Sequence, residues 1–158
     1  FERGNPLANL EELETAFSNF QQSNLIYKKR SPRSAELLEA KLKARYLLIK
    51  NEAGLAIKTL ERVGKYDFDP RTEAITWARA LSMQGNHQAA LSKLEHITHT
   101  CPMAPEPLIT QAKIAKKAGN ETLYLSSLES AQKSLTVADA DFHLLPDLKN
   151  IRAQTNGR

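Results

Sequence analysis

Residues 81–91, LSMQGNHQAAL, join two segments of helical character through one glycine and one asparagine. Glycine readily adopts the left-handed conformation that ends a helix, and asparagine is a favourable first cap for the next helix. The same pair recurs 34 residues later as Gly119 and Asn120, and Asn51 stands 34 residues before Gly85. This spacing predicts a repeat of two helices and one turn in every 34 residues.

Apolar and small residues recur with the same period. Within each half of a repeat they are three or four positions apart, which is typical of an amphipathic helix, and we expect them to face the core. The columns are Ala44, Ala78 and Ala112 in the first helix, then Ala56, Ala90 and Tyr124, Leu60, Leu94 and Leu128, and Val63, Ile97 and Ala131 in the second.

The middle repeat has a characteristic set of residues: Trp77, Ala78 and Leu81 in its first helix, Gly85 at its turn, Ala90, Leu94 and Ile97 in its second helix, and Pro102 at its end. This set resembles the pattern of the tetratricopeptide repeat (TPR) family. Asn51 and Tyr124 depart from the pattern, because the family usually has glycine and a small residue at these places. The resemblance implies an all-α fold, a right-handed α-solenoid of helical hairpins, with repeats at 37–70, 71–104 and 105–138.

Each end of the chain lies outside the repeats. Leu10, Leu13, Phe17 and Phe20 form one apolar stripe, which predicts a helix over 6–22. Apolar residues after the last repeat predict a capping helix over 139–155, because the end of an array exposes apolar surface unless it is covered. We therefore expect residues 1–158 to form one TPR-like domain.

Composition excludes several classes of protein. No apolar run in the sequence is long enough to cross a membrane. Cys101 is the only cysteine, so the chain forms no internal disulfide, and both a cytoplasmic and a periplasmic location stay open. Because the sequence begins with Phe1 and not with methionine, we expect it to be part of a larger protein.

No pattern in the sequence predicts a reaction. The six glycines are dispersed, so there is no phosphate-binding loop and no dinucleotide fingerprint. His96 and His99 are three residues apart but no third ligand follows at a useful spacing, so we expect no metal site. We therefore expect a non-catalytic protein that needs no cofactor.

The repeat also aligns basic residues. The resemblance to the TPR family implies that the first helices of the repeats line a concave groove. One column of these helices holds Arg45, Arg79 and Lys113. Basic residues one turn away and neighbouring polar and apolar residues complete the candidate groove: Lys41, Lys116, Lys117, Thr76, Thr110, Ile75, Met83 and Ile109. A basic groove favours an acidic protein or peptide as the partner.

Two alternatives remain open. The first is a polyanion-binding surface between residues 26 and 50, where eight basic and two acidic residues give a net charge of +6. Residues 28–33, of which four are basic, are expected to form a basic loop that could meet anionic lipid, whereas no nucleic-acid-binding module is recognisable. The second alternative is an accessory domain of a larger envelope-assembly enzyme or regulator.

Overall fold

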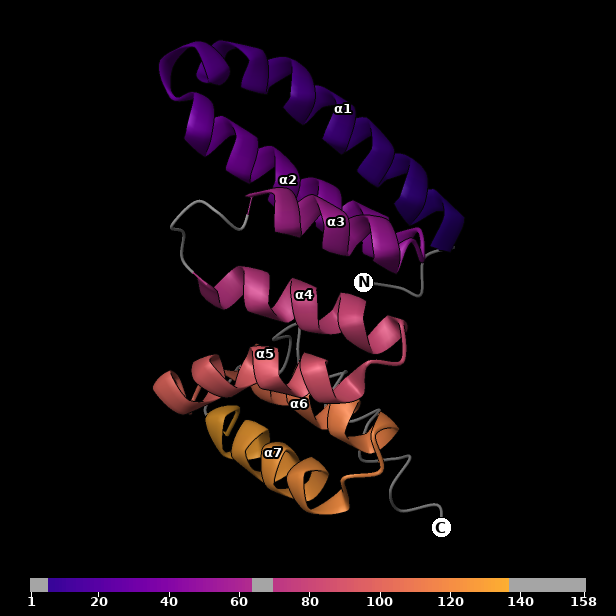
Figure 1. The fold of residues 1–158 in the computed structure, drawn as a ribbon, viewed down its shortest axis with the longest axis vertical. Coiled ribbons are helices and arrows are strands. Elements are labelled where there is room, and N and C mark those ends of the chain that lie inside the picture. The colour runs from indigo at the N-terminus through magenta and orange to yellow at the C-terminus, as the bar shows by residue number, and fades with distance from the viewer. Residues whose placement is uncertain (1–5, 64–69, 137–158) are drawn as a thin grey trace. The chain divides into compact units, whose positions relative to one another are not determined.

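A computed structural model describes residues 6–63 and 70–136, and all the regular structure in these ranges is α-helical (Figure 1). The chain divides into two compact units, residues 1–69 and 70–158. Unit 1 contains α1 (Pro6–Arg30), α2 (Pro32–Ile49) and α3 (Ala53–Val63). Unit 2 contains α4 (Pro70–Met83), α5 (His87–Thr100), α6 (Pro105–Lys117) and α7 (Glu121–Ser134).

Three turns of the same geometry join the helices into the hairpins α2–α3, α4–α5 and α6–α7. The residue at the turn has a left-handed backbone each time, with φ of 62° at Asn51, 80° at Gly85 and 72° at Gly119. The next amide donates to a carbonyl five residues back, which is the helix-ending Schellman arrangement. These bonds join Glu52 to Leu47 (2.8 Å), Asn86 to Leu81 (3.0 Å) and Asn120 to Ala115 (2.9 Å). The predicted recurrence of the turn is confirmed.

Two of these turns also start the next helix as the sequence predicts. The side chain of Asn86 accepts a hydrogen bond from the amide of Ala89 (3.3 Å), and that of Asn120 accepts one from the amide of Leu123 (3.0 Å). Each bond satisfies an amide that has no partner within its own helix. Glycine or asparagine therefore ends one helix, and the asparagine after the glycine begins the next.

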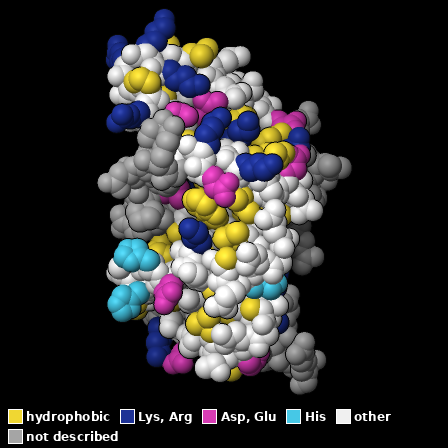
Figure 2. Space-filling view, viewed as in Figure 1, with side chains coloured by type: hydrophobic (Ala, Val, Ile, Leu, Met, Phe, Trp, Pro, Cys, Tyr) yellow, Lys and Arg dark blue, Asp and Glu magenta, His cyan; other side chains and the backbone are white. Residues whose placement is uncertain are grey.

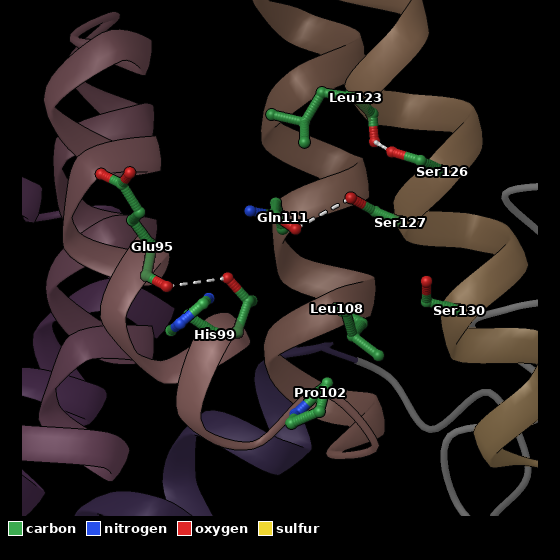
Figure 3. Close-up of a pocket in the computed structure, with 10 residues that line it drawn as sticks. Glu95, His99, Pro102, Leu108, Gln111, Leu123, Ser126, Ser127 and Ser130 are labelled. Carbon is green, nitrogen blue, oxygen red and sulfur yellow. Dashed lines mark hydrogen bonds between the residues drawn. The ribbon is translucent and has the colours of Figure 1, made fainter.

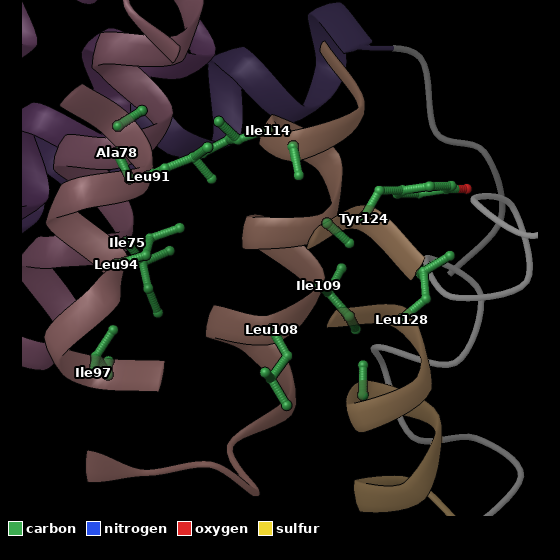
Figure 4. Close-up of a cluster of buried hydrophobic side chains, with 14 of the residues drawn as sticks. Ile75, Ala78, Leu91, Leu94, Ile97, Leu108, Ile109, Ile114, Tyr124 and Leu128 are labelled. Atoms are coloured by element: carbon green, nitrogen blue, oxygen red, sulfur yellow. The ribbon is translucent and has the colours of Figure 1, made fainter. Parts of the chain in front are cut away.

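The predicted apolar columns are buried in both units. The three alanines of the first helices have no exposed surface, and the nine residues of the second-helix columns are at most 8% exposed. In unit 2 the helices α4 and α5, α5 and α6, α6 and α7, and α4 and α6 pack against one another. Figure 4 shows Ile75 and Leu94 facing the core from α4 and α5, with Ile109 and Leu128 contributed by α6 and α7.

The first helix is longer than the sequence predicts. It was expected over 6–22, but α1 continues to Arg30, and Ser31 alone separates it from α2. The apolar stripe ends at Phe20 because the next residue that faces the core is polar. Asn24 is 3% exposed and donates from Nδ2 to the carbonyl of Ala35 at 3.1 Å. The basic segment 28–33 was expected in a loop, but it lies at the end of α1 and the start of α2.

A cluster of aromatic and polar side chains holds the middle of α1 against the C-terminal end of α2. The rings of Phe17 and Tyr46 stack with their centroids 5.6 Å apart. The Tyr46 hydroxyl donates to Oε1 of Glu14 at 2.6 Å, and Nζ of Lys50 lies 3.3 Å from the same oxygen. Hydrogen bonds from Tyr46 and Lys50 to the ionised carboxylate hold the pKa of Glu14 below its usual range.

Some predictions about domain organisation stay predictions. The capping helix over 139–155 lies outside the described residues. The first hairpin begins at Pro32, five residues before the predicted start of its repeat at residue 37. Packing is known within each of the two units, so the single domain over 1–158 remains an expectation.

Candidate functional site

The first helices of the two hairpins in unit 2, α4 and α6, are joined by one side chain. Nη2 of Arg79 on α4 lies 3.2 Å from Oε1 of Glu106 and 3.2 Å from Oγ1 of Thr110, both on α6. The side chains of Arg79 and Glu106 are 48% and 47% exposed. The guanidinium group is thus held at the exposed seam between the two helices.

Exposure divides the predicted groove residues of unit 2, apart from the half-buried Lys116, into two sets. Arg79, Met83, Lys113 and Lys117 are exposed. Four others are buried and cannot meet a partner without a rearrangement of the core: Ile75 and Thr76 are each 6% exposed, and Ile109 and Thr110 each 2%. The apolar contact area expected from the two isoleucines belongs to the core, because both lie in the buried cluster between the helices.

Lys116 has a different environment from its neighbours. Its Nζ lies 5.3 Å from the centroid of the Tyr124 ring, a cation–π contact with α7. The side chain is half-buried. Lys116 therefore faces the second helix of its own hairpin, whereas the predicted groove lies on the first helices.

The remaining two predicted residues belong to unit 1. Both lie on α2, where Lys41 is half-buried and Arg45 is exposed. Arg79 and Lys113 belong to unit 2. The alignment of Arg45 with these two side chains therefore stays a prediction of the 34-residue spacing.

The role of Glu106 is not evident from the sequence. Its carboxylate partly neutralises Arg79, so this surface is less basic than the column of cations suggests. An exposed ion pair of this kind contributes about 0–1 kcal/mol, so a carboxylate of a partner can replace Glu106 at little cost. In the sequence, Glu106 stands four residues, about one helical turn, before Thr110, and this spacing indicates only that the two side chains share one face of the helix.

Unit 2 also has a hollow of about 340 Å³ between α5, α6 and α7, which the sequence did not predict (Figure 3). Its polar lining comes from Glu95, Thr98 and His99 on α5, Gln111 on α6, and Ser126, Ser127 and Ser130 on α7. The Ser127 hydroxyl donates to Oε1 of Gln111 at 2.9 Å. Both ionisable side chains, Glu95 and His99, are exposed. The sequence feature that corresponds to this hollow is the pair Ser126 and Ser130, which are four residues apart and so share one face of a helix.

Residues 6–63 and 70–136 contain neither a cluster of metal-binding side chains nor a membrane-spanning helix. Nowhere in these ranges do three or more histidine, cysteine, aspartate or glutamate side chains gather as they would around a metal ion. No helix in these ranges combines the length and the apolar character needed to cross a bilayer.

Comparisons with protein-family models, curated proteins and solved structures give no match to this chain. The resemblance to the TPR family therefore remains a prediction from the repeat pattern. The candidate surface on α4 and α6 is defined by the contacts of Arg79 with Glu106 and Thr110.

Proposed function

We propose that the chain is a non-catalytic protein-interaction module, a TPR-like α-solenoid that binds an acidic segment of another protein along α4 and α6. The observation that carries this proposal is the placement of Arg79 between Glu106 and Thr110 at an exposed seam. Lys113 lies one helical turn beyond Thr110 and is exposed. A partner that lies along the seam meets both cations in succession.

The interaction is an exchange of carboxylates. A side chain of the partner replaces Glu106 on the Arg79 guanidinium, which offers the paired N–H geometry that suits a carboxylate. Lys113 and Lys117 steer the acidic segment towards the seam. Met83, which is 39% exposed, supplies flexible apolar contact area next to the charged groups.

The test is selection of peptides from a random displayed library on the immobilised full chain. Selected peptides are expected to be enriched in aspartate and glutamate. Affinities are then measured by fluorescence anisotropy for the chain and for the double variant Arg79→Glu, Lys113→Glu. We expect this variant to bind at least about tenfold more weakly, the factor that corresponds to 1.4 kcal/mol.

Lys133→Glu is the matched control. Lys133 is an exposed cation on α7 in an ion pair with Glu129 at 2.8 Å, so its reversal also breaks one surface pair. We expect this variant to retain the affinity of the original chain, and circular dichroism to show unchanged helicity in all variants. Equal affinity of the double variant and the original chain would refute the role of the seam.

A polyanion-binding function is separated from this proposal by salt. Counterion release makes the affinity for any polyanion fall steeply with salt concentration, regardless of sequence. Saturable binding of one acidic peptide, with a scrambled peptide of equal charge binding more weakly, supports the seam. Equal binding of both peptides and of heparin supports a general polyanion surface instead.

A further inference from the structure

The last two turns of α1 carry large aliphatic side chains on the outer face of the helix. Leu25 is 61% exposed and Ile26 is 70% exposed. Lys29 follows Leu25 by four residues, and Arg30 follows Ile26 by four residues. All four side chains therefore lie on the same side of the helix. Asn24, on the inner side, is buried against α2. The outer face is thus apolar and basic at once.

Contacts with α2 hold this face in place. The hydrogen bond from Asn24 to the Ala35 carbonyl fixes the rotation of α1 about its axis. Nζ of Lys28 lies 2.6 Å from Oε2 of Glu39, on the side of α1 that faces α2. Only Ser31 separates α1 from α2, so the connection between these two helices is short and pre-organised. Leu25 and Ile26 cannot turn inwards without breaking these contacts.

The cations around the two aliphatic side chains are available for a ligand. Lys29, Arg30 and Arg33 are exposed, and in the described part of the chain no acidic side chain pairs with any of them. Figure 2 shows lysine and arginine side chains gathered around hydrophobic ones at the end of unit 1 where α1 meets α2. The α1–α2 tip is defined here as Leu25, Ile26, Lys29, Arg30 and Arg33.

We propose that the α1–α2 tip binds the surface of an anionic lipid bilayer. Leu25 and Ile26 enter the boundary between headgroups and acyl chains, and the three cations contact lipid phosphate and carboxylate groups. Two adjacent aliphatic side chains are a small apolar area compared with the roughly 800 Å² per partner of a stable protein interface. They suit shallow insertion, in which anionic lipid adds the rest of the attraction. This surface is independent of the seam on α4 and α6.

The experiment is co-sedimentation of the full chain with vesicles of phosphatidylcholine that contain phosphatidylserine, and with vesicles of phosphatidylcholine alone. We expect binding to the anionic vesicles and little to the neutral ones. The variant Lys29→Ala, Arg30→Ala should weaken binding about fivefold for each cation removed. Leu25→Ser, Ile26→Ser should weaken it comparably or more, since insertion of the aliphatic groups is lost.

Two control variants match these changes at other exposed sites. Leu55→Ser removes an aliphatic side chain that is 51% exposed on α3, and Lys58→Ala removes an exposed cation from the same helix. Both are expected to bind vesicles as the original chain does. Circular dichroism of every variant, compared with the original chain, checks that the fold is retained.

Three outcomes would overturn the proposal. The first is absence of binding to anionic vesicles, or equal binding to neutral ones. The second is a serine variant that binds vesicles as well as the original chain, which indicates a general polyanion surface. The third is a chain that dimerises in analytical ultracentrifugation and becomes monomeric in the serine variant, which would make a second copy the occupant of the tip.

Discussion

Replacement of Gly85 by alanine is expected to destabilise unit 2 through the backbone alone. Gly85 has φ of 80°, in the left-handed region that side chains with a Cβ atom disfavour. A Cβ atom built at this position has nothing within 4 Å, so the substitution causes no steric clash with neighbouring residues. The variant therefore isolates the conformational cost of the turn.

The magnitude follows from two opposing contributions. A left-handed conformation costs a residue with a side chain about 1–2 kcal/mol. Alanine also restricts the unfolded chain more than glycine does, which offsets about 0.4–1 kcal/mol of that cost. The net loss for Gly85→Ala is about 1 kcal/mol. With a urea dependence of roughly 1–3 kcal/mol per molar, the midpoint should fall by roughly 0.3–1 M.

The chain itself supplies the control. Asn51 occupies the equivalent position of the first hairpin with φ of 62°. Asparagine tolerates the left-handed region better than alanine, so Gly85→Asn should lose less stability than Gly85→Ala. Conversely, Asn51→Gly should leave unit 1 close to its original stability.

The assay is urea unfolding followed by fluorescence and circular dichroism. Trp77, the only tryptophan, lies in the middle of α4 and reports on unit 2, whereas circular dichroism reports on both units. Unchanged midpoints for Gly85→Ala, or equal losses for alanine and asparagine, would refute the reasoning. Such results would mean that the left-handed turn is not required.

Three further predictions test packing and electrostatics. Ala90 has no exposed surface, so Ala90→Leu should destabilise unit 2 by about 1–3 kcal/mol in urea unfolding through overpacking; a neutral result would contradict the repeat register. Asn24→Ala removes the buried bond to the Ala35 carbonyl and should cost about 1–2 kcal/mol, measured by circular dichroism with the exposed Asn19→Ala as control. The hydrogen bond from Lys28 holds the pKa of Glu39 below its usual range, so this pair stabilises the folded state above the unfolded pKa and loses that contribution as the pH falls through the folded one. Because the pair is partly exposed, the melting temperature of Lys28→Gln should be slightly below that of the original chain at neutral pH and converge with it as the pH falls through the folded pKa of Glu39; a constant difference would contradict the linkage.

Local features of this protein were determined by the sequence alone. The turns at Asn51, Gly85 and Gly119 depend on hydrogen bonds within six consecutive residues and on the left-handed preferences of glycine and asparagine. The buried columns follow from the 3.6-residue period of each helix. Because these interactions lie within one helix or one turn, a 34-residue register read from the sequence places them correctly.

Tertiary packing decided the partners and the exposure of side chains, which the 34-residue period does not determine. The stripe that predicted a helix over 6–22 stops at Phe20, and α1 continues because Asn24 finds a buried partner on α2. Likewise Arg79 meets Glu106, 27 residues away, only when α4 and α6 pack together. Burial of Ile109 also depends on the neighbouring helices. A side chain's spacing along the chain gives its face on a helix, whereas its partners and its exposure depend on which helix covers that face.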